Sequence, residues 1–374
     1  HNIMRSNDGG VTWSKLTVWW KTVHTDMHDY LFTANGNSLY EANDGGVWLT
    51  QDAGVSWSPK SDGLSATENY HAAVSPLYAN LIGTGTQDNG ELYYDGNWQT
   101  NRGGDWTTRM QMDYSPQKLI YYFDNKNRRP LPSGGSNAYG LPATLDSSVL
   151  KHVFSPDDAN LAYASSTSIW QSRNAGDNMP VWTQIATAPA VIRAMAICPG
   201  HTNILAYISS NKFYITHNAL DAAPVFTSVQ PFAVAASADM VISSLDTNLI
   251  FVALNKHIYK STDGGQSFTD MTGTLPNVTE MKVFLDEAGG KQGLYAGNSM
   301  GVYYRNNTMS DWINYSGSLP TIASVRDILW FNDGGVDARI YVSYFGRGVW
   351  QSHLVNTHTC NTPVISSAVF AGTQ

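Results

Sequence analysis

The chain is poor in cysteine, in charge and in long apolar runs, and each shortage excludes a class of protein. Two cysteines in 374 residues, Cys198 and Cys360, are too few for a disulfide scaffold and form one bond or none. Charged residues make up 14% of the chain and its formal net charge is -8, so no basic stripe exists that would neutralise the phosphates of a nucleic acid. No run of 18 apolar residues is present, so no segment is suited to cross a bilayer as a helix.

Turn-forming and aromatic residues are abundant instead. The chain has 32 Gly, 12 Trp and 20 Tyr, and 12% of it is aromatic. This composition is typical of an ordered all-β protein with many turns. The many Ser, Thr, Asn and Gly residues and the few Lys favour a secreted or cell-surface location. No signal peptide is visible, but the sequence opens within a repeat, so we expect that its natural start is not included.

One eight-residue pattern, S-x-D-x-G-x-T-W, returns at a fixed interval. It occurs at residues 6–13, 50–57 and 261–268, with degenerate copies around Asn174 and Asn218. Asp8 and Asp52 are 44 residues apart, Asn174 and Asn218 are 44 apart, and Asn218 and Asp263 are 45 apart. A fixed period of this size marks a repeat architecture.

The chemistry of the octet predicts a hairpin turn. Short Ser and Asp side chains can accept hydrogen bonds from nearby backbone N–H groups, and Gly supplies the positive φ that such turns need. A short apolar run precedes each copy, and the Trp or Phe anchors the following strand. We therefore predict that Asp8, Asp52 and Asp263 brace turns and do not catalyse a reaction, because repeated motifs usually mark architecture.

Two further ladders of eight rungs each, a turn and then an apolar strand, recur about 38–47 residues apart. Together with the octets they describe a four-stranded antiparallel unit, which is the blade of a β-propeller. We predict a single all-β propeller over residues 1–352, with the octet hairpins between the third and fourth strands. Eight blades are favoured, with an N-terminal strand closing the last blade. Seven blades or an unclosed ring are the alternative, if residues 1–13 belong to a preceding propeller.

Two regions depart from the period. Residues 125–145 lack an octet, and they are predicted to form either a long loop on the fourth blade or a degenerate hairpin. Residues 353–374 lose the periodicity and are predicted to be a linker that leads to a further domain that is not included.

Polar residues concentrate in the first two complete units, and we predict that they bind the ligand. In an extended strand His24, Asp26 and His28 would share one face, because side chains alternate. Asp44 and Asp88 occupy equivalent turns of adjacent units, so they should meet at one mouth of the central channel. The predicted binding set is His24, Asp26, His28, Asp44, Gln87, Asp88, Asn89, Asp105 and Arg109.

The same residues allow a metal site. His24, Asp26 and His28 have side chains that suit zinc or a similar ion. A hydrogen-bonded network is the alternative, because buried polar groups must be paired. We expect the network, with no cofactor and no tightly bound transition metal; a structural calcium ion is the alternative if the ligands are oxygens.

The octet is known as the Asp-box or BNR repeat, and the chain resembles Asp-box β-propellers over essentially all of residues 1–352. The stretch from His24 to Asp105 resembles secreted bacterial sortilin-like proteins more narrowly, and family-74 xyloglucan hydrolases share the Asp-box. This resemblance implies an exported or surface protein with several domains. Sialidases also carry Asp-boxes, but the sequence lacks an R-I-P-type start and a recognisable arginine cluster.

Two functions follow as expectations. The first is a non-catalytic binding or scaffold module of a larger protein, whose partner is a glycan, a protein or a neighbouring domain of the same polypeptide. The alternative is an inverting glycoside hydrolase acting on xyloglucan or β-glucan. Such an enzyme needs two carboxyls far enough apart to admit water, and the candidates are Asp26, Asp44, Asp88 and Asp105.

Overall fold

The computed structural model describes residues 2–18, 22–64, 67–106, 109–116, 119–122, 126–130, 137–279, 282–315, 324–331, 338–355 and 367–369. These residues are almost entirely strands and turns, with two short 3-10 helices, η1 (Ser147–Val149) and η2 (Ala288–Gly290). Within this part of the chain no helix is long and apolar enough to cross a membrane. The expected all-β class is therefore confirmed.

The strands form one hairpin and eight four-stranded antiparallel sheets. The hairpin pairs β1 (Met4–Arg5) with β2 (Ser14–Lys15). The first four sheets are β3 (Met27–Phe32), β4 (Leu39–Asn43), β5 (Gly46–Thr50), β6 (Ser58–Pro59); β7 (Asn69–Val74), β8 (Leu81–Thr86), β9 (Glu91–Asp95), β10 (Trp98–Arg102); β11 (Met110–Met112), β12 (Leu119–Tyr122), β13 (Asn127–Pro130), β14 (Asn137–Ala138); and β15 (Lys151–Phe154), β16 (Ala162–Ser165), β17 (Ser168–Ser172), β18 (Thr183–Thr187).

The last four sheets continue the same order. They are β19 (Ile192–Cys198), β20 (His201–Ser209), β21 (Lys212–Thr216), β22 (Thr227–Val229); β23 (Ala238–Ile242), β24 (Ile250–Leu254), β25 (His257–Ser261), β26 (Thr269–Asp270); β27 (Lys282–Asp286), β28 (Gly293–Asn298), β29 (Gly301–Arg305), β30 (Ile313–Asn314); and β31 (Val325–Phe331), β32 (Arg339–Tyr344), β33 (Gly348–His353), β34 (Ser367–Val369). Each sheet pairs its strands in chain order, as the repeat predicts.

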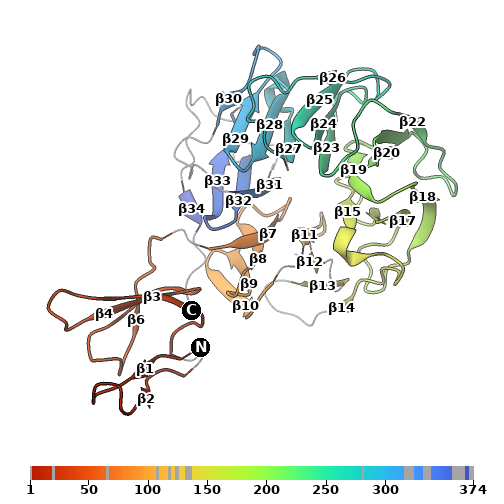
Figure 1. The fold of residues 1–374 in the computed structure, drawn as a ribbon. Helices are drawn as coiled ribbons and strands as arrows, with labels where there is room; N and C mark the ends of the chain where they lie inside the picture. The colour runs from red at the N-terminus through yellow and green to blue at the C-terminus, as the bar shows by residue number, and fades with distance from the viewer. Residues whose placement is uncertain are drawn as a thin grey trace.

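Seven of the eight sheets, from β7 to β34, curve around a common centre, whereas β1–β6 lie outside this ring (Figure 1). The ring closes where the last sheet meets the sheet β7–β10. There the Ala72 backbone N–H donates to Asp327 Oδ2 at 3.0 Å, and Asn69 Nδ2 donates to the Tyr344 carbonyl at 3.3 Å. The eight predicted four-stranded sheets are present, but only seven of them form the ring. Neither predicted closure is observed, because β3–β6 lies outside the ring together with β1 and β2.

The expected closure by an N-terminal strand differs from what is observed. β1 pairs with β2 in a separate hairpin, and β34 supplies the fourth strand of the last sheet. β34 lies inside the stretch 353–374, and the further domain expected beyond that stretch stays a prediction. Residues 127–130 and 137–138 form β13 and β14, so the described part of the irregular region is the degenerate hairpin.

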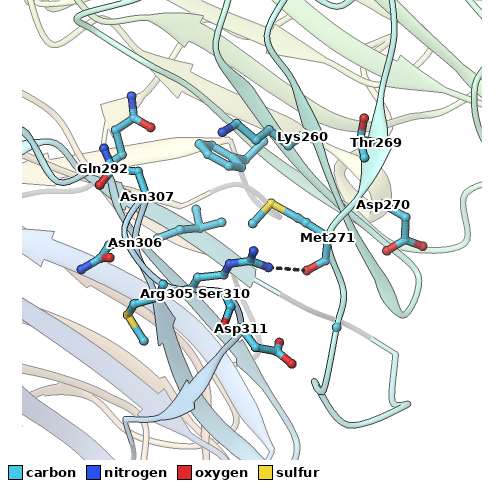
Figure 2. A pocket seen from close by; sticks show the side chains of 14 residues that line it. Lys260, Thr269, Asp270, Met271, Gln292, Arg305, Asn306, Asn307, Ser310 and Asp311 are labelled. Carbon is cyan, nitrogen blue, oxygen red and sulfur yellow. Dashed lines mark hydrogen bonds between the residues drawn. The ribbon is translucent and has the colours of Figure 1, made fainter.

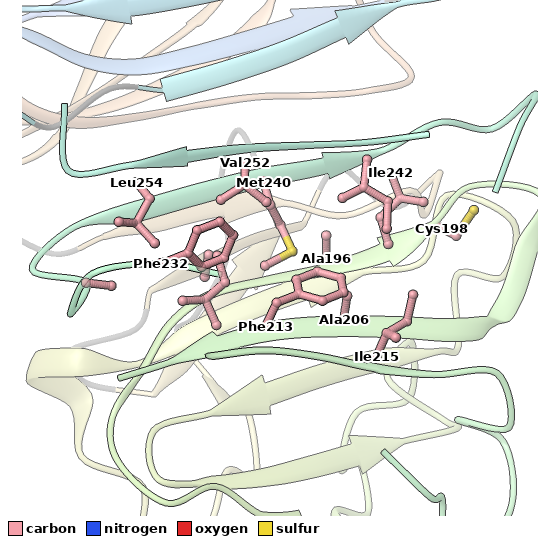
Figure 3. Close-up of a cluster of buried hydrophobic side chains, with 14 of the residues drawn as sticks. Ala196, Cys198, Ala206, Phe213, Ile215, Phe232, Met240, Ile242, Val252 and Leu254 are labelled. Carbon is pink, nitrogen blue, oxygen red and sulfur yellow. The ribbon is translucent and has the colours of Figure 1, made fainter. Parts of the chain in front are cut away.

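The core is made where neighbouring sheets of the ring face one another. Figure 3 shows the cluster between β19–β22 and β23–β26, with Phe213, Met240 and Val252 among its members. Phe213 is 1% exposed and packs edge-on against Phe268, the aromatic anchor of the third octet. Gly265 of that octet has a φ of 85°, and a Cβ there would lie 2.2 Å from Phe213 Cε1. Close approach therefore requires glycine at this turn.

The octet carboxylates act within their own turns. Asp8, Asp52 and Asp263 each accept the backbone N–H of the residue four positions later, at 2.8, 2.9 and 2.9 Å. Each also accepts the hydroxyl of that same residue, and this bond is the main reason that the three pKa values fall to about 2. These contacts support the predicted bracing role.

Cys198 is buried and free, and its thiol donates to the Ser243 carbonyl. Burial raises its pKa to about 12, which makes it an inert core residue. Cys360 lies outside the described residues.

Candidate functional site

The predicted polar residues gather where the outlying sheet β3–β6 meets the ring. Asp44 lies in the β4–β5 turn, and Asp88 lies in the equivalent β8–β9 turn. Asn89 Nδ2 donates to the Asp44 carbonyl at 2.9 Å, and His24 Nε2 lies 3.2 Å from the Asp88 carbonyl. Equivalent turns of adjacent sheets are thus neighbours, as predicted. The place differs, because β3–β6 is outside the ring: the residues sit at a junction beside the ring and not around its axis.

Three carboxyls define the centre of this junction cluster. Asp26, Asp44 and Asp88 each offer an oxygen within 4.8 Å of the others. Asp44 Oδ1 is hydrogen-bonded to His28 Nε2. The Asp88 backbone N–H donates to Asp105 Oδ1 at 3.1 Å. The cluster therefore joins groups from β3, two turns and the segment after β10.

Glycine residues and left-handed backbone conformations allow these turns to pack closely against neighbouring segments. Asp26 and Asp88 both have a φ of 58°, a conformation that short polar side chains tolerate better than most. Gly90 has a φ of 84°, and a Cβ there would lie 1.7 Å from the Arg102 carbonyl oxygen. A Cβ on Gly45 would lie 2.4 Å from His24 Cβ. Glycine at both positions lets the turns close around the carboxyls.

Contacts among the carboxyls of the junction cluster shift their pKa values. The hydrogen bond from Asp44 raises the pKa of Asp88 to about 6, with burial and the Asp105 charge adding to the effect. Burial alone would raise the pKa of Asp44, but hydrogen bonds with Asp88 and His28 outweigh it and lower that pKa. Bonding to Asp44 raises the pKa of His28. Below about pH 6, one proton is therefore shared between two carboxyls at the junction.

Strand alternation does not explain the two histidines. β3 begins at Met27, so His24 and Asp26 lie in the turn before it. Each histidine reaches a different turn: His24 contacts the β8–β9 turn and His28 contacts the β4–β5 turn. Among the described residues, the group that could hold a cation is Asp26, Asp44 and Asp88, without either histidine. The predicted His24–Asp26–His28 metal set is thus not formed, and hard oxygen ligands of this kind suit calcium better than zinc.

Of two other residues predicted for the binding site, one lies in the cluster and one does not. Gln87 belongs to the cluster, since its Oε1 accepts the Tyr70 hydroxyl at 3.0 Å. Arg109 does not: its Nη1 donates to the Leu150 carbonyl at 3.2 Å, next to β15 in the following sheet of the ring.

The sequence reading missed the aromatic residues beside the cluster. Tyr70 packs against Phe345, with ring centroids 5.7 Å apart. It also lies close enough to Asp105 and Asp88 to interact electrostatically with them. Trp106 follows Asp105 directly and carries the Arg102 guanidinium over its ring at 5.2 Å. Tyr70 in β7 and His28 in β3 both lie at an irregularity next to the first residue of their strands. The sequence does not show this equivalence, because the 44-residue spacing of Asp44 and Asp88 would pair His28 with Ala72.

A cavity of about 460 Å³ lies elsewhere, between the sheets β23–β26 and β27–β30 (Figure 2). Lys260 and Arg305 line it, and Arg305 Nη1 donates to the Met271 carbonyl at 3.4 Å. Its two carboxylates are already used: Asp270 pairs with His257 at 2.9 Å, and Asp311 accepts the Thr274 N–H at 3.2 Å. The cavity therefore offers no free pair of acids, and no sequence motif pointed to it.

Comparison with known proteins gives a structural similarity and no family. No family model matches the chain, and no curated protein matches it. Among solved structures it is similar to the GH74 enzyme of Niastella koreensis, at 13% identity and a TM-score of 0.43; the match covers 95% of this chain and 64% of that enzyme. The chain thus spans less than two thirds of the enzyme's length. Its own repeated four-stranded antiparallel sheets make it an all-β protein of β-propeller architecture.

Proposed function

We propose that the chain is a non-catalytic glycan-binding module of a larger secreted or cell-surface protein, and that the glycan binds at the junction cluster. The observation that carries this proposal is the Asp44–Asp88 carboxyl pair, flanked by the Asn89 amide and the Tyr70 ring.

This combination suits a polyhydroxylated ligand. Carboxylates accept hydrogen bonds from hydroxyls, and so can the Asn89 amide oxygen, while Asn89 Nδ2 donates to the Asp44 and Gln87 carbonyls. The half-buried Tyr70 and Phe345 rings add apolar area on which the C–H face of a sugar ring can lie. A few polar groups beside apolar area are the usual makeup of a small-molecule site.

The spacing of the carboxyls disfavours inverting hydrolysis by this pair. An inverting enzyme separates its two carboxyls by about 6.5–9.5 Å, so that a water molecule fits between them. Asp44 and Asp88 instead offer oxygens within 4.8 Å of each other. This separation is shorter than an inverting enzyme requires.

Hydrolysis of xyloglucan or β-glucan remains the second candidate because of one observation. A pKa of about 6 keeps Asp88 partly protonated near neutral pH, which is what a general acid needs. In that case the base would have to be a carboxyl other than Asp44.

The test compares binding with turnover. Xyloglucan and β-glucan oligosaccharides are titrated calorimetrically into the wild type, Asp88→Asn and Asn89→Ala, and released reducing ends are measured in parallel. Asp246→Asn, an exposed turn aspartate of the sheet β23–β26, is the matched control. The proposal expects binding without new reducing ends, weakened at least tenfold by either junction variant and unchanged by the control. Turnover that disappears in Asp88→Asn would establish the hydrolase instead, and equal affinity in all variants would contradict a junction site.

A further inference from the structure

Cationic side chains recur at one level of the ring. The first strands of the seven ring sheets stand next to one another around the centre (Figure 1). Within one residue of the start of each strand lies one of these polar residues: Tyr70, Arg109, Lys151, Arg193, Asp239, Lys282 and Arg326. Five of these seven are cations, although the chain has a net charge of -8. We call Arg109, Lys151, Arg193, Lys282 and Arg326 the cationic ring.

Hydrogen bonds between neighbouring sheets show that these positions adjoin. Arg109 Nη1 donates to the Leu150 carbonyl just before β15. The Val283 N–H of β27 donates to Asp239 Oδ2 of β23 at 3.0 Å, and the Ala72 N–H of β7 donates to Asp327 Oδ2 of β31. Each bond joins the first strands, or the start of one, in two adjacent sheets. The charges of Lys282, Arg109 and Arg193 all act on Lys151, so these side chains come together from four sheets.

The cations are poorly neutralised. Both nearby carboxylates, Asp239 and Asp327, already accept backbone N–H groups, and Asp327 also pairs with His71 at 3.5 Å. In the described part of the chain no carboxylate lies within ion-pair distance of Lys151, Arg193 or Lys282. Asp239 still acts on Lys151 and Lys282 acts on Asp327 over longer distances, so five cations face two carboxylates at this level.

Two further observations show that the cations lack compensating negative charge or hydrogen-bond acceptors. Burial, followed by the charges of Lys282 and Arg109, lowers the pKa of Lys151 to about 7. Arg326 Nε is buried without a hydrogen-bond partner among the described residues, while its guanidinium lies 4.9 Å over the Phe345 ring. An anion would relieve both, by holding Lys151 protonated and by accepting a bond from Arg326.

We propose that the cationic ring is an anion-binding site and that its ligand is the carboxylate of an acidic saccharide. The anion preference rests on the ring alone, because arginine forks match carboxylate geometry. The saccharide class rests on the proposed function. Tyr70 belongs to both places, since it occupies the ring level in β7 and donates to Gln87 of the junction cluster. A glycan held at the junction can therefore extend its acidic unit over the cations.

The probes are trigalacturonate and its methyl ester, which has the same sugar rings without the charges. The double variant Arg193→Gln/Lys282→Met removes two ring cations, and Lys60→Met/Lys256→Met removes two exposed lysines elsewhere as a charge-matched control. We expect trigalacturonate to bind the wild type and the control at least tenfold more tightly than it binds the ring variant. We also expect this binding to weaken as salt rises and the methyl ester to bind more weakly than the free acid.

The outcomes separate the two proposals. Equal binding of ester and acid, or unchanged binding in the ring variant, would overturn the ring site and leave the junction proposal standing. Triglutamate binding as tightly as trigalacturonate would overturn the saccharide class. If the ring variant does not fold, NMR of ¹³C-dimethylated lysines in the wild type decides: trigalacturonate should raise the pKa of Lys151, and an unmoved pKa at saturation would refute the site.

Discussion

The ring sheets and the outlying sheet β3–β6 are built from the same repeat, yet they bury different surfaces. Within the ring, β19 has one residue that is not buried, Arg193, because neighbouring sheets cover both of its faces. In the outlying sheet, Leu31 and Phe32 of β3 are each 65% exposed. The strand pattern is local, but burial depends on a neighbour. The repeat therefore specifies each sheet, and contacts between sheets specify the ring.

The largest expected effect contrasts two phenylalanines. Phe213→Ala should destabilise the protein by about 3–5 kcal/mol, because it empties a packed position between two ring sheets. Phe32→Ala should change stability by less than about 0.5 kcal/mol, because most of that side chain already faces water. Chemical denaturation of both variants measures the difference. Similar losses would show that the outlying sheet is covered in solution.

A second contrast uses one octet position in two settings. Gly265→Ala should cost about 2 kcal/mol, since its Cβ would meet Phe213 at 2.2 Å and its φ is positive. Gly10 occupies the same octet position and also has a positive φ, but a Cβ there would lie 3.8 Å from its nearest neighbour, Trp13. Gly10→Ala should therefore cost less stability. Thermal unfolding of the pair would reveal the gap. Equal losses of melting temperature in the two variants would mean that packing against Phe213 adds nothing to the cost of the turn conformation.

The octet aspartates should behave alike in both regions. Asp263 and Asp8 have pKa values lowered to about 2 by the same turn bonds. A lowered pKa contributes stability above the ordinary value of 3.8 and loses it as the pH falls toward 2. Asp263→Ala and Asp8→Ala should therefore each lower the melting temperature at pH 6 and converge on the wild type near pH 2. Persistence of the difference at pH 2 would assign the effect to packing instead.

The smallest effect lies at the boundary between the regions. Asp44→Asn should lower the pKa of Asp88 from about 6 toward 3.8, because it removes the neighbour whose bond and charge raise that pKa. A raised pKa stabilises the fold below pH 3.8 and loses this contribution as the pH rises through 6, so the variant should flatten stability in that interval. Carboxyl ¹³C NMR follows the titration. An Asp88 pKa that stays near 6 would show that Asp44 does not cause the shift.

Much of the fold could be predicted from the sequence, because its causes are local. The octets, the turn residues and the apolar strands each act within one sheet, and they gave eight four-stranded sheets. The closure of the ring could not be predicted in the same way. It depends on contacts such as Asp327 with Ala72, which join residues 255 positions apart and leave no periodic signal.

The site was predicted in part for the same reason. Equivalent repeat positions brought Asp44 and Asp88 together, whereas the alternation applied to His24 failed because β3 begins three residues later. The cationic ring was missed because its members lie in different repeats and each looks like an ordinary surface charge. Only superimposing the strand starts shows that Arg193 and Lys282 share one level.

The central claim is that a glycan binds at the Asp44–Asp88 pair, and the titration of Asp88 with and without ligand tests it most directly. Sugar hydroxyls that donate to the carboxylate favour its ionised form, so a saturating xyloglucan or β-glucan oligosaccharide should move the Asp88 pKa below about 6. The pKa of Asp263, in an octet turn of another sheet, should stay at about 2. An Asp88 pKa that is the same in free and saturated protein would contradict the account.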